Sequence, residues 1–319
     1  MSGARTKHRE GHADMNQRAA IASVTTALFL LGLKAWAAWT TGSVAMLGSL
    51  ADTALDVFAS LVTLYVVRHA AMPADEDHRF GHGKAEALGA LFQVTLISLS
   101  AIGIGWRVID RLLNGEVTAQ AELGIGVSVV AIAVTLALLA YQRAIIANTG
   151  SVAIEADHVH YQSDLLLNLG VIVALVLDQL LGLRGADPAI GILIAAWLAY
   201  GAWRASSRAI DQLMDKEWPE EKRLRFVEIA SRFPELENLH DLRTRTSGHN
   251  DFVQFHVWMD PDLSVREAHD IVERVEEEMA REFPGTEVLI HIDPAGHIDE
   301  PDNPMVEADE MEKLEGGNP

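Results

Sequence analysis

Apolar residues form long runs before about residue 214 of this chain and give way to charged residues after it. A helix that crosses a bilayer needs about 20 consecutive, mostly apolar residues, and six segments meet this requirement. They cover approximately residues 19–40, 44–67, 85–113, 121–146, 152–182 and 188–213. The pattern predicts a six-helix transmembrane domain at residues 19–214, preceded by an N-terminal tail at residues 1–18.

The periodicity changes after the sixth apolar segment. A helix, two strands around a Ser-Gly-His-Asn turn, a second helix and a last strand are predicted at residues 219–233, 239–260, 264–283 and 286–293. The second helix opens with Ser264 and, three residues later, Glu267, which is typical of a capping box. The order α-β-β-α-β predicts a small α+β domain at residues 215–295. The acidic residues 296–319 include few apolar side chains, and we expect them to be disordered.

Basic residues concentrate on one side of the predicted membrane segments. On that side lie Arg5, Lys7, Arg9, Arg18, Arg68, Arg79, Lys84, Arg143, Arg204 and Arg208. The opposite side carries only Arg107, Arg111 and Arg184. Because cytoplasmic loops are enriched in Lys and Arg, we expect both termini to be cytoplasmic. The N-terminus also lacks the short apolar stretch and cleavage site of a signal peptide.

Composition narrows the range of partners. The formal net charge of −20 argues against binding to nucleic acid, whose phosphates select basic surfaces, but it does not argue against metal cations. The chain contains no cysteine, so it forms no disulfide. Any bound metal must therefore be held by nitrogen and oxygen ligands.

Two aspartates interrupt the second apolar segment. Each ionised aspartate at the centre of a membrane helix costs about 2.5–3.5 kcal/mol on insertion scales. Asp52 and Asp56 are four residues apart, so they share one helix face and repel each other if both are charged. They could be protonated, or they could pair with Lys34 in the first segment, although one lysine cannot balance two carboxylates. We favour a bound cation, whose charge removes the repulsion.

The fifth apolar segment repeats this spacing with His160 and Asp164. Two helices that each present two ligands on one face can surround one ion. Three carboxylates and one imidazole in tetrahedral geometry suit Zn²⁺, while Fe²⁺, Mn²⁺ and Cd²⁺ are alternatives. The nearby Glu155, Asp157 and His158 are expected to be solvated residues at the membrane interface, near the entry path of the ion, with direct metal ligation as the alternative.

Two further clusters contain metal-binding residue types. In the loop after the second segment, Asp75, His78 and His82 surround a Gly-containing turn, a spacing that is as common in solvated loops as in metal sites. The soluble domain distributes several histidines and one aspartate over its strands and second helix: His240, His256, His269, His291 and Asp293. Scattered surface histidines are the alternative for this second set.

Together these motifs resemble the cation diffusion facilitator family, specifically its bacterial zinc-exporting branch. The resemblance extends from about residue 15 to residue 295. It rests on SLADTALD, PADEDHRFGHGKAE and HYQSD in the first part of the chain, and on LHDLRTR, HVWMD, AHD and IHIDP in the soluble domain. The departures are Lys34 in the first segment, Ile292 between the two predicted ligands of the last strand, and the acidic tail.

The resemblance implies a homodimer that exchanges metal for protons, with a ferredoxin-like cytoplasmic domain. It implies a transport site of Asp52, Asp56, His160 and Asp164. It implies a loop site of Asp75, His78 and His82. It implies a binuclear site at the dimer interface, made of His240, His256, His269, His291 and Asp293. Lys84 and Asp215 would form a charge interlock between the membrane and soluble parts.

These expectations describe a multi-pass secondary transporter of the bacterial inner membrane that exports Zn²⁺ in exchange for protons. A membrane-embedded metalloenzyme is disfavoured, because no H-E-x-x-H or G-x-S-x-G motif is present and four protein ligands would close the metal site. ATP-driven pumping is disfavoured by the lack of a G-x-x-x-x-G-K-[ST] motif. A membrane metal sensor that does not transport is a further alternative.

Overall fold

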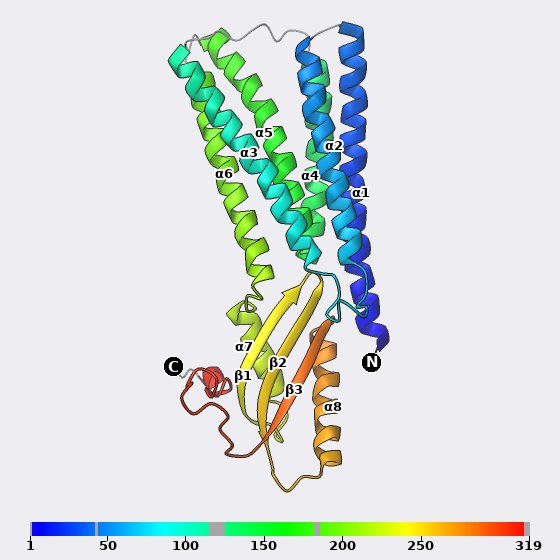
Figure 1. Ribbon diagram of the computed structural model, residues 1–319, viewed down its shortest axis with the longest axis vertical. Helices are drawn as coiled ribbons and strands as arrows, with labels where there is room; N and C mark the ends of the chain where they lie inside the picture. The colour runs from blue at the N-terminus through cyan, green and yellow to red at the C-terminus, as the bar shows by residue number, and fades with distance from the viewer. Residues whose placement is uncertain (1, 42–43, 115–124, 182–185, 316–319) are drawn as a thin grey trace. The chain divides into compact units, whose positions relative to one another are not determined.

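The computed structural model describes residues 2–41, 44–114, 125–181 and 186–315, and these form two units. One unit is His12–Ile210, and the other combines Asp211–Pro319 with Met1–Gly11. Figure 1 identifies the helices and strands of both units.

Within the described residues, six long helices occupy the predicted membrane region, as expected. They are α1 (Ser2–Thr41), α2 (Val44–Ala70), α3 (Ala85–Asn114), α4 (Ile125–Thr149), α5 (Val152–Leu181) and α6 (Ala186–Leu213). The first helix begins well before residue 19, so the described part of the expected N-terminal tail is helical. The predicted start of the fourth segment, residues 121–124, and the predicted end of the fifth, residue 182, lie outside the described residues.

Five of these helices are long and apolar enough to cross a membrane: Gly11–Thr40, Ser49–Ala70, Ala85–Asp110, Val127–Thr149 and Pro188–Leu213. The sixth helix, α5, carries Glu155, Asp157 and Asp164 in its first half. Large apolar side chains such as Trp39 and Trp106 are exposed on the outside of the helices. A surface of this kind suits lipid rather than water.

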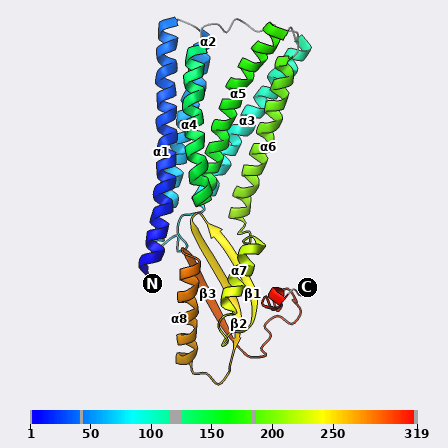
Figure 2. The ribbon, with the colours of Figure 1, turned by 180° about the vertical axis from the view of Figure 1, so that it is seen from behind.

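Apolar clusters hold the membrane unit together, and two of them join different groups of helices. One joins α1, α2, α4 and α5 through buried residues that include Ala20, Val67, Ile145 and Ile154. The other joins α3 to α6, with Ile97 and Leu198 at its centre. Figure 2 shows α5 between these two groups of helices. Helix α5 therefore contacts both groups, so its polar face lies inside the unit.

The soluble unit has the predicted element order α-β-β-α-β. Its elements are α7 (Glu220–Ala230), β1 (Glu237–Ser247), β2 (Asn250–Met259), α8 (Val265–Glu282) and β3 (Thr286–Pro294). Strands β1 and β2 are antiparallel around a turn in which Gly248 has φ of 61°, and β3 pairs in parallel with β2. Ser264 and Glu267 form the predicted capping box at the start of α8.

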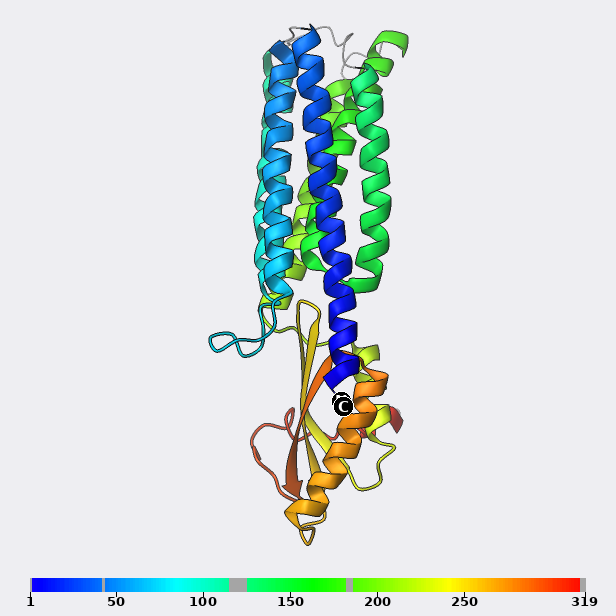
Figure 3. The same cartoon turned by 90° about the vertical axis from the view of Figure 1, so that its right-hand side faces the viewer.

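Both helices of the soluble unit cover the same face of the sheet, as the side view in Figure 3 shows for α8. Phe226 of α7 and Met279 of α8 are fully buried against Phe255 and Val257 of β2. Because side chains alternate along a strand, His256 between these two residues points to the opposite face. The fold therefore places the histidine-bearing face of the sheet away from the helices.

The segment after β3 contacts the sheet and core up to Met311, whereas its composition predicts disorder. The backbone N–H of Asp241 donates to the carbonyl of Val306 at 2.9 Å, and that of Glu310 donates to the carbonyl of Leu239 at 2.7 Å. Met311 packs against the apolar core. The segment ends in a short 3₁₀ helix at Glu312–Glu315, and residues 316–319 lie outside the described residues.

Candidate metal centre

Asp56 on α2 and two residues on α5, His160 and Asp164, converge inside the membrane unit. His160 and Asp164 are four residues apart and project from one face of α5. His160 Nε2 lies 3.2 Å from Asp56 Oδ1 and 3.7 Å from Asp164 Oδ2. One ligand atom from each residue lies within 4.8 Å of the other two. The structure thus brings together three of the four residues predicted for the transport site.

The spacing of these atoms fits a small tetrahedral ion. A zinc ion bound at about 2.0–2.1 Å from nitrogen and oxygen places neighbouring ligand atoms about 3.3 Å apart. The two distances from His160 Nε2, 3.2 and 3.7 Å, bracket this value. These two distances from His160 therefore match the spacing of ligand atoms around one small cation.

Asp52 lies on α2 one helical turn before Asp56, and its side chain is exposed. Among the described residues, it is not part of the group of ligand atoms that lie within 4.8 Å of one another. Its i, i+4 relation to Asp56 still places it on the same face of α2. To act as a fourth ligand, Asp52 would have to lie closer to the other three residues than it does here.

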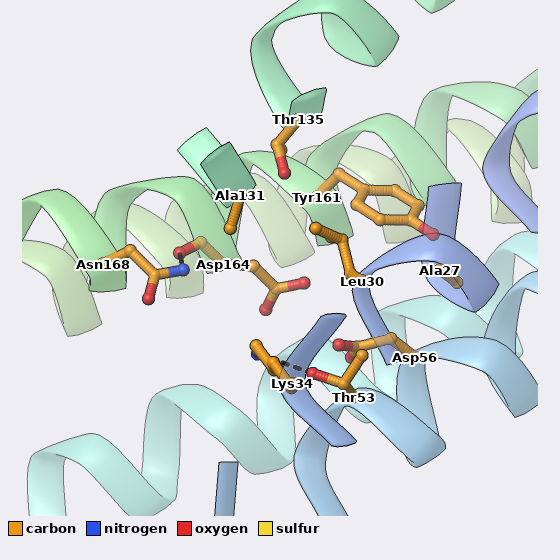
Figure 4. A pocket seen from close by; sticks show the side chains of 10 residues that line it. All are labelled: Ala27, Leu30, Lys34, Thr53, Asp56, Ala131, Thr135, Tyr161, Asp164 and Asn168. Atoms are coloured by element: carbon orange, nitrogen blue, oxygen red, sulfur yellow. Dashed lines mark hydrogen bonds between the residues drawn. The ribbon is translucent and has the colours of Figure 1, made fainter. Parts of the chain in front are cut away.

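A small pocket lies against Asp56 and Asp164. Figure 4 shows both carboxyl groups at this pocket, together with Lys34, Thr53 and Tyr161. Its volume of about 30 Å³ is enough for one or a few water molecules. Lys34 Nζ donates to Thr53 Oγ1 at 2.6 Å, so the ammonium group is held at the edge of the acidic pocket. Its charge lies near the carboxylates without a hydrogen bond to either.

Asp157, one turn before His160, is fully buried, so the expectation that it is a solvated interfacial residue is wrong. Its Oδ2 accepts hydrogen bonds from Ser23 Oγ at 2.6 Å and from Gln142 Nε2 at 2.8 Å. Its Oδ1 accepts from Gln93 Nε2 at 3.2 Å and lies 3.5 Å from Thr63 Oγ1. One carboxyl group on α5 therefore joins α1, α2, α3 and α4.

This five-helix junction continues to the residues beside the metal ligands. The hydroxyl group of Tyr161, next to His160, donates to the carbonyl of Ser23 at 3.0 Å and lies 2.8 Å from Ser60 Oγ. The other two expected interfacial residues differ from Asp157. His158 is half-buried between Gln142 and Gln162. Glu155 forms an ion pair with Arg208 of α6.

Sequence reasoning also missed a second buried acid. Glu86, at the start of α3, is 2% exposed. Its carboxyl group accepts from Asn16 Nδ2 at 3.2 Å and from Ser151 Oγ at 2.5 Å. The available signal was the presence of amide and hydroxyl side chains within otherwise apolar helices, since such groups need partners in a membrane.

The loop between α2 and α3 brings Asp75, His78 and His82 together. Asp75 Oδ2 lies 3.2 Å from His82 Nε2, and Asp75 Oδ1 lies 3.4 Å from His78 Nδ1. His82 is buried, and its Nδ1 has no hydrogen-bond partner among the residues that the structure describes. The backbone N–H of His78 donates to Asp75 Oδ1 at 2.6 Å and, with that of Asp77, lowers the pKa of the Asp75 carboxyl group. Asp75 is thus stabilised as a carboxylate, the form that binds metal.

A third group of ligand atoms lies on the open face of the soluble unit's sheet. His256, His291, Asp293 and Asp299 each offer an atom within 4.8 Å of the others. His256 Nδ1 lies 3.1 Å from Asp293 Oδ2 and 3.4 Å from Asp299 Oδ2, and His291 Nε2 lies 3.3 Å from Asp293 Oδ1. Asp299 belongs to the segment expected to be disordered, so it was not predicted as a ligand.

The remaining predicted residues of the soluble unit differ in position. His240 is buried, and its Nδ1 lies 2.8 Å from the carbonyl oxygen of Asn238, which leaves Nε2 directed toward Asp293 Oδ2 at 3.7 Å. A hydrogen bond of this kind fixes the tautomer of a metal-binding histidine. His269 is exposed on α8 and is not a member of the group. Lys84 and Asp215 belong to different units, and their interlock stays a prediction.

Comparison with known proteins identifies the family. The model described as "Cation efflux transmembrane domain" matches residues 20–214, and "Cation efflux protein, cytoplasmic domain" matches residues 218–295. The chain is 43% identical over 281 residues to the cation-efflux pump FieF of Cronobacter sakazakii, which covers 88% of this chain and 93% of that protein. It is 41% identical over 289 residues to FieF of Klebsiella pneumoniae subsp. pneumoniae, covering 91% of this chain and 96% of that protein.

These relatives are efflux pumps and not enzymes. The matched transmembrane domain and the apolar helices indicate a multi-pass membrane protein. The ligand clusters of the membrane and soluble units supply candidate sites for a divalent cation. The chain therefore belongs to the cation diffusion facilitator family and is a cation efflux transporter.

Proposed function

We propose that the protein exports Zn²⁺ in exchange for protons, and that Asp52, Asp56, His160 and Asp164 form its transport site. The observation that carries this proposal is the convergence of Asp56, His160 and Asp164 inside the membrane unit. An imidazole and carboxylates are ligands that Zn²⁺ accepts in tetrahedral geometry. Asp52 supplies the fourth ligand after a local movement of α2.

Transport follows an alternating-access cycle in which the same ligands face one side of the membrane and then the other. Metal binds only to the deprotonated ligands, so binding releases protons and release of the metal allows protons to return. His160 is the residue best suited to this exchange, because imidazole titrates near neutral pH. Lys34, held by Thr53 at the pocket edge, partly balances the carboxylates when the ion has left.

The two other clusters are proposed as sites that regulate or deliver metal. Asp75, His78 and His82 form a loop site on the cytoplasmic side. The soluble domain binds metal through His240, His256, His291 and Asp293, with Asp299 as an added ligand and His269 in a role at the dimer interface. The match to the family's cytoplasmic domain supports a homodimer, in which Lys84 and Asp215 couple the two parts of each chain.

Basic residues at one end of the membrane helices support an orientation with both termini in the cytoplasm. In a bacterium this places the transporter in the inner membrane, surrounded by lipid. A cation on the cytoplasmic side would then be carried outward. Export is consistent with the names of the relatives.

The experiment is metal flux in proteoliposomes that contain a fluorescent zinc indicator, with and without an imposed pH gradient. We expect zinc flux to increase when protons are driven in the opposite direction and to vanish when the gradient is collapsed in the absence of a zinc gradient. Flux that is the same with and without the gradient would refute proton exchange. A complete lack of flux with normal zinc binding would instead favour the sensor alternative.

Competition by Fe²⁺, Mn²⁺ and Cd²⁺ tests the choice of metal in the same vesicles. Only one of the three converging ligands is a nitrogen, and carboxylate oxygen also suits Mn²⁺. We expect Cd²⁺ to compete with zinc more strongly than Mn²⁺ does. Stronger competition by Mn²⁺ or Fe²⁺ would overturn the assignment of Zn²⁺ as the main substrate.

A further inference from the structure

A large groove lies between α4, α5 and α6, separate from the small pocket at the metal ligands. Its volume is about 740 Å³. Arg143 of α4 and Arg204 and Arg208 of α6 line it together with Glu155 of α5. Helices α4 and α6 end, and α5 begins, at the same end of the membrane unit (Figure 2), so all four charged residues lie toward that end.

The charges of the groove are unbalanced. Arg208 pairs with Glu155. Within the described part of the chain, neither Arg143 nor Arg204 forms an ion pair, and both side chains are exposed. Arginines at this depth would repel a divalent cation, so the groove is unsuited to the transported metal. They are suited to a phosphate group, with which guanidinium forms paired hydrogen bonds.

Apart from His158 and Gln162 of α5, the rest of the groove is apolar and aromatic. Trp197 and Tyr200 of α6 and Leu136 of α4 line it, and each is at least 40% exposed. They lie farther from the end of the helices than the arginines do, since they precede Arg204 on α6 and Arg143 on α4. A small hydrated anion would gain no binding energy from these apolar side chains, whereas an acyl chain would bury them.

We infer that this groove is a binding site for an anionic glycerophospholipid. The phosphate group binds Arg143 and Arg204, with Arg208 beside them, and an acyl chain lies along Trp197 and Tyr200. Basic pockets between transmembrane helices are known to select anionic headgroups. The lipid would fill the space between α4 and α6 and hold α6 against the rest of the bundle.

The test is native mass spectrometry of the full-length protein with phosphatidylglycerol or phosphatidylcholine of the same acyl chains. We expect tighter binding of phosphatidylglycerol to the parent protein. Each arginine near a headgroup contributes about five-fold in affinity, so Arg143→Gln/Arg204→Gln should weaken phosphatidylglycerol binding by roughly 25-fold and weaken binding of the zwitterionic phosphatidylcholine less. Arg68→Gln is the matched control, because Arg68 is exposed at the end of α2 and does not line the groove.

Equal affinity for the two lipids in the parent protein, or an equal loss in the double variant and the control, would overturn the inference. Inorganic phosphate distinguishes a lipid from a free anion: displacement of the lipid by millimolar phosphate would show a simple anion site and reject the lipid. Binding that disappears when the protein dimerises would show that a second chain covers the groove, and would also reject it.

A second measurement does not depend on the stability of the double variant. Phosphatidylglycerol with brominated acyl chains should quench tryptophan fluorescence more than brominated phosphatidylcholine does. Trp197→Phe should remove this difference, because Trp197 lines the groove. Trp39→Phe is the control, since Trp39 is exposed on α1 and does not line the groove. An undiminished difference in Trp197→Phe would place the lipid elsewhere and contradict the inference.

Discussion

Replacement of Asp157 should loosen the whole membrane unit. Its carboxyl group accepts hydrogen bonds from Ser23 Oγ, Gln142 Nε2 and Gln93 Nε2 at 2.6, 2.8 and 3.2 Å. Asp157→Ala removes the acceptor but leaves these three buried donors in place. A buried donor without an acceptor costs about 1–3 kcal/mol. The change therefore acts on α1, α3 and α4 as well as on α5.

The lower end of that range applies, because each donor has another acceptor nearby. Ser23 Oγ also donates to the carbonyl of Ala19 at 3.2 Å, and Gln142 Nε2 lies 3.0 Å from Ser23 Oγ. Gln93 Nε2 lies 2.8 Å from Thr63 Oγ1. About 1 kcal/mol for each of three donors gives a loss of about 3 kcal/mol. For a unit of this size the melting temperature should fall by roughly 6–12 °C.

Asp157→Asn is the informative companion variant. It keeps one acceptor oxygen, and its new N–H group can donate to Gln93 Oε1, which is buried and has no hydrogen-bond partner in the described part of the chain. We expect a loss of about 1 kcal/mol. Asp14→Ala is the control, since Asp14 forms an exposed ion pair with Arg18 that contributes little to stability.

The assay is thermal unfolding of the full-length protein in detergent, followed by intrinsic tryptophan fluorescence. The expected order of melting temperatures is parent and Asp14→Ala highest, Asp157→Asn intermediate and Asp157→Ala lowest. Equal melting temperatures for Asp157→Ala and the parent would refute the reasoning, because the junction would then contribute nothing to the stability of the bundle. An equal fall in both Asp157 variants would show that charge, and not the number of acceptors, matters.

Three other changes test separate parts of the structure. A Cβ atom at Gly89 would lie 2.7 Å from Val66 Cγ1, so Gly89→Ala should destabilise the α2–α3 contact by about 1–2 kcal/mol in the same unfolding assay. The double variant Gly89→Ala/Val66→Ala should recover this loss, and no recovery would contradict the close packing of the two helices. Ser264→Ala removes the capping box with Glu267 and should lower the free energy of unfolding by about 1 kcal/mol. Amide hydrogen exchange in the first turn of α8 should be faster in Ser264→Ala and normal in Ser264→Asp, and unchanged exchange in Ser264→Ala would contradict the cap. The pKa of Asp75 is lowered mainly by the backbone N–H donor of His78. The carboxylate of Asp75 therefore stabilises the loop above the pKa of the unfolded chain, and this stabilisation is lost as pH falls through the lower pKa of the folded chain. NMR titration of the metal-free protein should give a midpoint below the usual 3.8, and a midpoint above it would contradict the hydrogen bonds.

The fold could be predicted because its signals are local. Six apolar runs, the alternation in three strands and the Ser264–Glu267 pair each lie within one continuous stretch of sequence. The pairs Asp52–Asp56 and His160–Asp164 are local too, since their i, i+4 spacing fixes a common helix face. The two pairs can converge wherever their two helices are neighbours. The structure brings three of these four residues together.

The parts that could not be predicted depend on contacts between distant segments. Hydropathy places Asp157 at the start of an apolar helix, but its partners come from four other helices, so its burial is invisible in the local sequence. Asp299 joins the histidine cluster because the segment after β3 folds back against β1. The composition of this segment predicts disorder because it is acidic and has few apolar residues. One of those few, Met311, packs against the core of the soluble unit.

The most direct test of the transport site is zinc flux after alanine replaces Asp56 and Asp164 together, in vesicles that carry equal amounts of folded protein. His256→Ala is the control, because His256 belongs to the cluster of the soluble unit. We predict that the double variant neither binds zinc in the membrane nor moves it, while His256→Ala keeps both properties. Zinc flux at the parent's rate in Asp56→Ala/Asp164→Ala would contradict the proposal that these residues hold the transported ion.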